Sequence, residues 1–433
     1  MKTGLAYKTV HEIKVFQEQE LQKLLVYLQQ QSPFYSKLFD KHKIDIKSIK
    51  YIEDLTQLPV TTKDHLQTSN TDFICVPTNK IAEYVTTSGT LGTPITYVLT
   101  EGDLERLAYN EATSFNCTGG SADDIYQLVC TMDKRFMAGL AYYLGARKIG
   151  AATIRVGAGE PQLQWDSINR FLPTAIVVVP SFLLKMIKYA DEHNIDYNKS
   201  SVKKAICIGE PIRQQDFTYN TLGEQITQKW DIKLFSTYAS TEMSTAFTEC
   251  EQGVGGHQIP DLIITELLDN NNQPVKPGEP GELTITTLGI EGMPLLRFKT
   301  GDICFSYTEP CQCGRHTMRL GPIIGRAQQM IKYKGTTLYP ETIFNALNEL
   351  PDIENYVVEV SSNEIGTDMV LIKLGVVNGS ASKEYFIEAI KSRLRVTPEI
   401  ELHSPKDINK WLFPAMSRKP VKFIDRRLPG LAN

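Results

Sequence analysis

Short apolar segments alternate with amphipathic ones from about residue 84 onward, and this alternation limits the folds open to the chain. Residues 174–180 (TAIVVVP) form the apolar run of a buried strand, and residues 181–194 (SFLLKMIKYADEHN) have the periodicity of a helix. A second strand is expected at 203–211, a helix at 213–230 and a third strand at 233–240 (KLFSTYAS). Strands that alternate with helices predict an α/β fold with a largely parallel sheet covered by helices.

The second half of the chain has a different pattern. Residues 261–269 (DLIITELLD) and 282–288 (ELTITTL) predict two strands joined by a turn, which adds a β-layer to the mixed or parallel sheets. Beyond Gln328, a strand, a helix, two strands and a helix predict a separate, smaller α+β unit. A chain of 433 residues is long enough for two domains, and we place them at 1–327 and 328–433.

Composition excludes several classes of partner. The net charge of −4 provides no basic surface for nucleic acid or an anionic membrane. The longest apolar runs are too short to cross a bilayer, and the opening segment lacks the apolar core of a signal peptide, so we expect a cytoplasmic protein. In that compartment the eight cysteines are not expected to form a disulfide framework. The sequence leaves open whether the protein is a homodimer.

The segment 85–97 (VTTSGTLGTPITY) concentrates serine, threonine and glycine between two apolar segments. A Walker phosphate loop needs a lysine and a helix directly after the glycines, whereas Ile95, Tyr97 and Leu99 alternate as in a strand. Hydroxyls and exposed glycine amides can still bind phosphate oxygens without a helix. The alternative is a tight hairpin loop, which the segment taken alone slightly favours.

Two further motifs place acidic residues where a ligand could meet them. Glu242, in 236–242 (STYASTE), directly follows the strand predicted at 233–240, and ligands of parallel sheets bind at such strand ends. Asp302 follows a glycine in 297–302 (RFKTGD), where it could bind two ribose hydroxyls or cap a turn. A lone glutamate is usually a solvated charge, and each of these motifs is weak alone.

The order of these motifs along the chain is more specific than any one of them. TTSGTLGTP, YASTE, KTGD, GRAQQMIKYKG and a lysine near the C-terminus follow one another. This order resembles the adenylate-forming superfamily of acyl-CoA synthetases, adenylation domains and luciferases. Within it, SPFYSKLFDKH, AGLAYYLGARKIGA, ELTITTLGIEGMPLLRFKTGDI and PCQCGR resemble the phenylacetate–CoA ligases. The resemblance extends from about residue 30 to about residue 427.

The resemblance implies a role for each matching residue. The implied ATP- and AMP-binding residues are Ser88, Gly89, Thr90, Gly92, Thr93, Gly209, Glu210, Pro211, Tyr238, Ala239, Ser240, Asp302 and Arg326. Thr241 would contact the α-phosphate, Glu242 would coordinate Mg²⁺, and Lys419 would be the catalytic lysine. The implied acyl pocket consists of Phe136, Gly139, Gly209 and Ala239. Gly335 would line the coenzyme A tunnel, and Gln328 would be the hinge of a mobile C-terminal domain.

The chain departs from the family pattern at four places. Relatives often have a lysine where this chain has Thr93, and a glycine where it has Ala239, whose methyl group would narrow the acyl pocket. The hinge pair is Gln328-Gln329, and Arg418 replaces the glycine that usually precedes the catalytic lysine. None of these changes removes a group that the chemistry must have.

Four of the chain's thiol and imidazole groups form a candidate metal site. They lie in two short segments, 250–257 (CEQGVGGH) and 311–314 (CQCG), and are Cys250, His257, Cys311 and Cys313. Three thiolates and one imidazole are a usual closed set for structural Zn²⁺. The alternative is a buried cysteine that packs as a small hydrophobe, together with a surface histidine.

The resemblance implies an ATP-dependent aryl-acid–CoA ligase. The carboxylate of an acid such as phenylacetate would attack ATP, release pyrophosphate and form an acyl-adenylate, from which coenzyme A would then displace AMP. One alternative is a stand-alone adenylating enzyme that loads a carrier protein. Another is a non-catalytic nucleotide-binding relative, which would bind ATP without acid-dependent pyrophosphate exchange.

Overall fold

The computed structural model describes residues 4–87, 95–276, 278–334, 336–363, 368–376, 382–394, 396–413 and 420–427. The chain folds into two compact units. The first comprises the residues up to Thr300 and Cys304–Ile323, and the second comprises Gly301–Ile303 and the chain from Ile324 onward. Each unit is described by itself.

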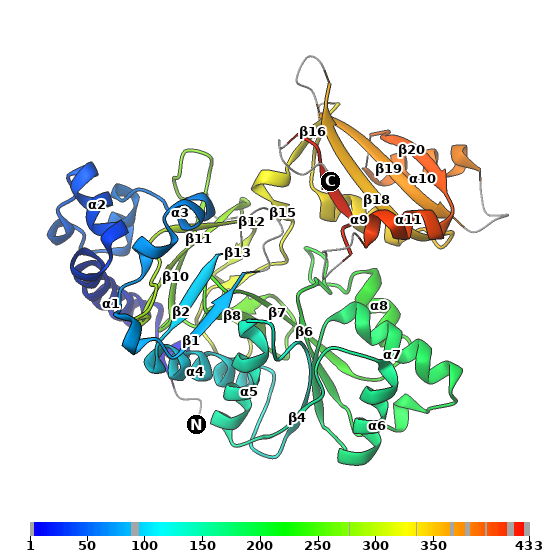
Figure 1. Cartoon of the computed structure of the whole chain (residues 1–433), viewed down its shortest axis with the longest axis horizontal. Helices are drawn as coiled ribbons and strands as arrows, with labels where there is room; N and C mark the ends of the chain where they lie inside the picture. The colour runs from blue at the N-terminus through cyan, green and yellow to red at the C-terminus, as the bar shows by residue number, and fades with distance from the viewer. Residues whose placement is uncertain are drawn as a thin grey trace. The chain divides into compact units, whose positions relative to one another are not determined.

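The first unit is organised around a mixed sheet that includes β4, β6, β7, β8 and β13 (Figure 1). The nine strands of this sheet have the order β13-β14-β9-β8-β7-β6-β5-β3-β4. The pairs among β4, β3, β5, β6 and β7 are parallel, and the pairs from β7 to β13 are antiparallel. The strands are β3 (Ile125–Val129), β4 (Ala152–Arg155), β5 (Ala175–Val178), β6 (Lys204–Ile208), β7 (Lys233–Ser240), β8 (Thr245–Glu249), β9 (Gly256–His257), β13 (Ser306–Tyr307) and β14 (Arg319–Leu320).

Helices cover both faces of the parallel part of this sheet. Along β5, Ile176 and Val178 join a core with α6 (Pro161–Phe171), α7 (Pro180–Glu192) and α8 (Thr221–Thr227). The alternate residues Ala175 and Val177 join a second core with α4 (Glu101–Cys117) and α5 (Met137–Ile149). Because successive side chains of a strand point to opposite faces, a strand between two helical layers must be apolar throughout. The predicted α/β class is confirmed.

The β-layer predicted for residues 261–288 is also present. The strands β10 (Ile263–Leu268) and β11 (Gly281–Thr287) pair antiparallel, and β12 (Phe298–Cys304) continues their sheet. A separate antiparallel pair consists of β1 (Glu83–Thr86) and β2 (Thr96–Leu99).

The N-terminal helices pack on this β-layer and its core. The helix α1 (Val10–Gln31) begins with a capping box between Thr9 and Glu12, and α2 (Pro33–His42) begins with Pro33. A proline is compatible with the first turn of a helix, where its missing N–H has no partner to lose. The short α3 (Lys63–Thr68) follows. Within the described ranges, no helix combines the length and the apolar character that crossing a bilayer requires.

The prediction of a helix at 213–230 is wrong for the first half of this segment. Only α8 is helical, because Asn220 caps its N-terminus through a hydrogen bond from the Gly223 N–H. The preceding residues instead form a turn that is closed by a bridge between Arg213 and Tyr219. Arg213 also forms a buried ion pair with Glu249, at 2.6 Å. The segment has helical periodicity, but the Asn220 cap and the ion pair with Glu249 stabilise a different local structure.

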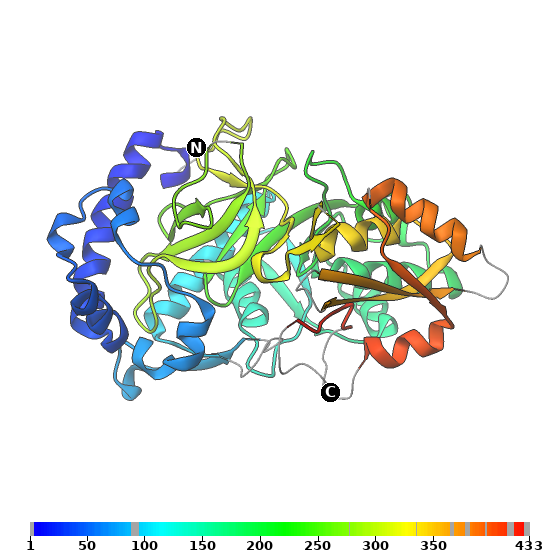
Figure 2. The same ribbon diagram turned by 90° about the horizontal axis from the view of Figure 1, so that it is seen from above.

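The second unit, which is mostly yellow to red in Figure 2, contains a sheet with helices beside it. This sheet has four strands in the order β20-β19-β18-β21. The strands are β18 (Ile353–Ser362), β19 (Asp368–Val376), β20 (Glu399–His403) and β21 (Phe423–Asp425). On one face lie α9 (Pro340–Asn348) and α10 (Lys383–Leu394), which pack on Val358 and Val360. On the other lies α11 (Pro405–Leu412), which packs on Val357. A small hairpin, β16 (Ile331–Tyr333) and β17 (Thr336–Leu338), precedes α9.

Candidate active site

The carboxyl ends of three adjacent parallel strands form the candidate site in the first unit. The register pairs Val178 of β5 with Cys207 of β6, and Ile208 of β6 with Thr237 of β7. The segments that follow these strands therefore start side by side. At such an edge the crevice outside the strand ends is the usual ligand site of an open α/β sheet.

The strand β7 extends past β6 and there pairs, among the described residues, with β8 alone. Tyr238, Ala239 and Ser240 pair with Phe247, Ala246 and Thr245 respectively. On the other edge of β7 the chain of β6 turns away at Gly209, whose φ of 76° is a left-handed conformation that favours glycine. Six of the residues implied to bind ATP and AMP thus lie in adjacent segments: Gly209, Glu210, Pro211, Tyr238, Ala239 and Ser240.

Thr241 and Glu242 lie in the tight turn between β7 and β8. The turn is closed by a hydrogen bond from the Ser244 N–H to the Ser240 carbonyl, and Met243 is fully buried beneath it. The guanidinium of Arg106, on α4, donates to the Ser244 carbonyl at 2.7 Å. Glu242 itself is half-buried. These contacts fix the backbone of the turn that carries Glu242.

Tyr97 is a residue near Glu242 that the sequence did not single out. Its ring is buried, and among the described residues its hydroxyl has no hydrogen-bond partner. Burial raises the pKa of Tyr97 well above its ordinary value, and the charge of Glu242 acts in the same direction. A buried hydroxyl without a partner is costly, so a donor or acceptor supplied by a ligand would satisfy it. The half-buried Glu242 carboxylate is an oxygen ligand of the kind that Mg²⁺ prefers.

Two residues of the implied acyl pocket lie in the loop and helix after β3. Phe136 is 41% exposed and precedes α5. Gly139 is buried in the first turn of α5, and a Cβ at this position would clash with the Thr131 carbonyl oxygen. The need for glycine at this position therefore comes from the close approach of the helix to its own loop.

The implied phosphate-binding residues, the coenzyme A tunnel glycine and the catalytic lysine lie outside the described residues. These are Ser88, Gly89, Thr90, Gly92, Thr93, Gly335 and Lys419. The strands beside the first motif are described, and Thr86 of β1 pairs with Thr96 of β2. A strand and not a helix follows the motif, which confirms that it is no Walker loop.

Asp302 and Arg326 form a pair in the second unit. They are opposite each other where β12 meets β15 (Gly325–Arg326), and the Arg326 Nε lies 3.4 Å from the Asp302 Oδ1. Gln328 follows in the short 3₁₀ turn Ala327–Gln329. The fold therefore brings together the residue implied to bind ribose and its arginine, two residues before the implied hinge.

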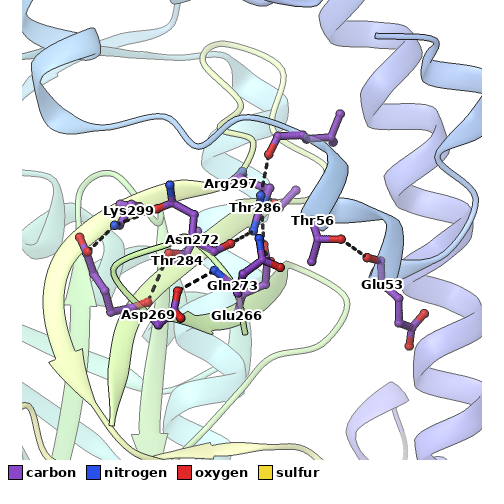
Figure 3. Close-up of polar contacts among 12 residues, drawn as sticks. Glu53, Thr56, Glu266, Asp269, Asn272, Gln273, Thr284, Thr286, Arg297 and Lys299 are labelled. Atoms are coloured by element: carbon purple, nitrogen blue, oxygen red, sulfur yellow. Dashed lines mark hydrogen bonds and ion pairs between the residues drawn. The ribbon is translucent and has the colours of Figure 1, made fainter. Parts of the chain in front are cut away.

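The start of β12 is fixed by a buried arginine (Figure 3). Arg297 is 1% exposed and donates two hydrogen bonds to the Glu266 carboxylate, at 3.0 and 3.1 Å. It also donates to the carbonyls of Leu58 and Asn272, and Lys299 donates to the Asn272 side chain. The φ of Arg297 is 44°, a left-handed backbone conformation that is strained for a residue with a long side chain.

Sequence reasoning missed this arginine cluster. One signal was available: Glu266 interrupts an otherwise apolar strand, and a charge in such a position is usually paired. The partner, 31 residues further along the chain, was not visible from local patterns. The cluster fixes the segment that leads to Asp302.

The four predicted zinc ligands converge in the first unit. One ligand atom from each of Cys250, His257, Cys311 and Cys313 lies within 4.8 Å of all the others. The Cys250 and Cys311 sulfurs are 3.7 Å apart, and the Cys313 sulfur is 3.4 Å from the His257 Nε2. Burial lowers the pKa of His257 to about 3, which keeps the imidazole neutral. This donor set could hold a metal ion.

The fold and the order of the motifs define an adenylate-forming enzyme. A family model described as AMP-binding enzyme matches residues 10–291, and the chain belongs to that family. The expected superfamily is therefore confirmed.

Curated relatives extend the likeness over most of the chain. It is 28% identical over 370 residues to the phenylacetate-coenzyme A ligase of Thermus thermophilus, covering 84% of this chain and 82% of that protein. It is 27% identical to the phenylacetate-coenzyme A ligase of Escherichia coli, covering 77% and 76%. Family and relatives support adenylate-forming CoA ligase activity, with an acid, ATP and coenzyme A as substrates.

A solved structure shares the fold of the whole chain. It is a 2-hydroxyisobutyryl-CoA ligase in the postadenylation state in complex with R3-HIB-AMP. The TM-score is 0.83 at 23% identity, and the match covers 98% of this chain and 91% of that chain.

Proposed function

We propose that the protein is an ATP-dependent ligase that joins an aromatic, phenylacetate-like acid to coenzyme A through an acyl-adenylate. The observation that supports this most is the likeness to phenylacetate-coenzyme A ligases over three quarters or more of the chain. The geometry agrees with it, because Gly209, Tyr238 and Glu242 meet at one edge of the parallel sheet. The acyl pocket would lie beside Phe136 and Ala239. The aromatic ring of Phe136 and the small side chain of Ala239 suit a flat apolar acid.

In the first half-reaction the substrate carboxylate attacks the α-phosphorus of ATP and pyrophosphate leaves. Tyr238 would stack on adenine, and Asp302 would accept hydrogen bonds from the ribose hydroxyls. Thr241 would donate to the α-phosphate as negative charge builds there, and Lys419 would neutralise that charge. Glu242 would hold Mg²⁺, which shields phosphate charge when bound. The threonine and glycine groups of residues 88–93 would bind the departing pyrophosphate.

In the second half-reaction the thiolate of coenzyme A attacks the acyl carbon and AMP leaves. We propose that the second unit turns about Gln328 between the two steps, so that Lys419 withdraws and Gly335 approaches the pantetheine arm. Such a turn would separate the two reactions in time and exclude water from the reactive mixed anhydride.

Acid-dependent exchange between ATP and labelled pyrophosphate tests this function. The wild-type protein should catalyse exchange with phenylacetate and related aromatic acids, and should be much slower with short aliphatic acids. Thioester formation with free coenzyme A should follow. Exchange without transfer to free coenzyme A would instead indicate a carrier protein as acceptor. ATP binding without exchange for any acid would contradict the proposal and indicate a non-catalytic relative.

We also propose that Cys250, His257, Cys311 and Cys313 bind a structural Zn²⁺ ion. Zn–S bonds of about 2.3 Å and a Zn–N bond of about 2.1 Å give a tetrahedron with edges of about 3.8 and 3.6 Å. The separations of 3.7 and 3.4 Å between ligand atoms suit such a site, and a disulfide would need a much shorter one. The other ring nitrogen of His257 lies 3.0 Å from the Thr317 hydroxyl, a contact that would orient the ring.

The backbone at both cysteine turns suits metal binding. A hydrogen bond from the Gly253 N–H to the Cys250 carbonyl closes one turn, and one from the Gly314 N–H to the Cys311 carbonyl closes the other. Both glycines have positive φ, at 64° and 87°. A fifth sulfur nearby, that of Cys117, donates to the Thr248 carbonyl and does not belong to the ligand set.

A further inference from the structure

The helix α7 begins at the candidate site without a cap of its own. It starts directly after β5, and its N-cap residue is Val179, whose side chain can accept no hydrogen bond. The first N–H groups of a helix have no partner within the helix and need acceptors from elsewhere. Asp, Asn, Ser and Thr are the residues that usually supply them locally.

Glu210, in the loop that follows the neighbouring strand β6, supplies the missing acceptor. Its Oε2 accepts a hydrogen bond from the Ser181 N–H at 2.9 Å, and its Oε1 accepts one from the Ser181 hydroxyl at 3.0 Å. Both carboxylate oxygens are thus engaged with one residue in the first turn of α7. A negative charge at a helix N-terminus is also favourable for the helix dipole.

The segment from Gly209 to Pro211 is fixed at its other end as well. The Pro211 carbonyl accepts a hydrogen bond from the Asn220 side chain, and Asn220 is the N-cap of α8. Gly209 has a φ of 76°, with no atom within 4 Å of the position of a Cβ, so backbone conformation and not space calls for glycine. The segment is therefore hydrogen-bonded to the beginnings of two helices. It starts directly after Ile208, the residue of β6 that pairs with Thr237 of β7.

We propose that Glu210 is a positioning residue, which acts through Ser181 and does not itself contact the nucleotide or the acid. Its carboxylate fixes the Gly209–Pro211 backbone beside Tyr238, so that the backbone groups of this segment form one wall of the adenine and acyl pocket. This inference rests on the proposed function and deepens it, because it transfers the binding role from the Glu210 side chain to the backbone that the side chain holds.

Four variants test the proposal: Glu210→Ala, Glu210→Gln, Ser181→Ala and the double variant of Glu210→Ala with Ser181→Ala. The readouts are KM and kcat for ATP and acid in pyrophosphate exchange, the Kd of ATP alone, and the melting temperature. Glu210→Ala should raise KM and Kd about tenfold with little change in kcat. Glu210→Gln should recover most of this loss, because an amide can accept from the N–H and donate to the hydroxyl.

The double variant separates positioning from direct contact. If Glu210 acts through Ser181, the double variant should bind ATP no more weakly than Glu210→Ala, since the interaction is already lost. Ser181→Ala alone should cost about two- to threefold, because its N–H remains. Independent, multiplicative losses would overturn the proposal and indicate that Glu210 touches the ligand. Unchanged KM and Kd in Glu210→Ala and Glu210→Gln would also overturn it.

A matched control lies at another helix N-terminus. The Glu12 carboxylate accepts hydrogen bonds from the N–H and the hydroxyl of Thr9 at the start of α1, which is the same chemistry away from the site. Glu12→Ala should leave KM and Kd unchanged. Absence of exchange in the wild type would contradict the proposed function, and the ATP affinities of the variants would still decide the role of Glu210.

Discussion

Glu111 is a carboxyl group that the folded chain buries without an ion-pair partner among the described residues. It lies on α4 and is 3% exposed, in contact with the position where a Cβ of Gly145 would be. One oxygen accepts a hydrogen bond from the Asn110 amide, and the other has no partner within the described part of the chain. Burial raises the pKa of Glu111 to about 8, so the group is mostly protonated at neutral pH.

The raised pKa of Glu111 predicts a pH dependence of stability. Between its unfolded pKa of about 4.3 and its folded value near 8, the native protein holds a proton that the unfolded chain has released. This contribution to the free energy of unfolding therefore falls as pH rises through that window. Glu111→Gln should remove that fall, so that the variant gains stability over the wild type between pH 5 and 8, by up to a few kcal/mol.

Melting temperatures measured at intervals from pH 5 to 8 check this prediction. Glu105→Gln, at an exposed position of the same helix, should keep the wild-type slope. Parallel profiles for Glu111→Gln and the wild type would show that Glu111 does not bind the extra proton.

Lys419 is the residue on which the proposed first half-reaction depends most. In the proposed mechanism its charge would be needed only while negative charge builds on the α-phosphate. Loss of one preorganised donor to such an oxyanion costs roughly 10²–10³ in rate. Lys419→Ala should therefore nearly abolish acid-dependent pyrophosphate exchange, yet still convert presynthesised acyl-adenylate into thioester at close to the normal rate.

Lys422 is the matched control for Lys419. Its ammonium group lies 5.3 Å from the centre of the Tyr356 ring, and its carbonyl accepts a hydrogen bond from Val358, so it belongs to the sheet of the second unit. Lys422→Ala should retain exchange. The reverse pattern, with exchange lost in Lys422→Ala and kept in Lys419→Ala, would show that the catalytic lysine is Lys422.

At the scale of elements, β12 depends on one buried ion pair. Arg297→Leu leaves the Glu266 carboxylate buried without its cation, and loss of one partner of such a pair costs about 3–5 kcal/mol. Burial raises the pKa of Glu266 above its ordinary value, and the hydrogen bond and charge of Arg297 offset part of that rise. We expect a clear fall in melting temperature for Arg297→Leu, and partial recovery when Glu266→Leu is added.

Thermal denaturation of the two single variants and the double variant measures this coupling. Lys299→Ala is the control, because Lys299 is only partly buried and pairs with Glu282 on the same sheet. A double variant less stable than Arg297→Leu alone would contradict the account of β12 given above.

The stability of the turns at 250–257 and 311–314 should depend on bound zinc. Protein purified without chelators should contain about one equivalent of Zn²⁺, and Cys313→Ser should lose the ion and melting temperature together. Zinc-finger peptides gain ~10–16 kcal/mol from the ion, and a large domain with its own core should depend on it less. Metal analysis and calorimetry measure both quantities.

Cys117→Ser is the control for the zinc prediction. Its sulfur is buried in the same cluster but donates to the Thr248 carbonyl, which a serine hydroxyl can also do. It should keep the metal. Metal-free wild-type protein of unchanged stability would mean that the four residues merely pack together.

At the scale of the whole molecule, the two half-reactions should respond differently to a fixed backbone at Gln328. Gln328→Pro fixes φ and removes the N–H at the proposed hinge. We expect the adenylate to form and thioester formation to fail, whereas Gln328→Ala, which leaves φ free, should support both steps. Single-turnover assays of each half-reaction check this. Equal loss of both in Gln328→Pro would mean that the hinge lies elsewhere.

The sequence by itself determined those features that repeat locally along the chain. Apolar periodicity predicted the alternating strands and helices, the β-layer and the separate C-terminal unit, because burial on one or two faces imposes a period on nearby residues. The order of the motifs identified the superfamily, and the residue types Cys250, His257, Cys311 and Cys313 identified a possible metal site. Where a local cap competed with periodicity, at 213–220, the sequence prediction was wrong.

Only the tertiary structure decided what the isolated polar groups do. Glu210 caps α7, Arg297 pairs with Glu266, and the Tyr97 hydroxyl lies buried near Glu242. A carboxylate or guanidinium has the same local sequence signal whether it meets solvent, a helix end or an opposite charge. Its partner is chosen by strand order and register, which bring together segments that lie tens to hundreds of residues apart, and no local pattern encodes that choice.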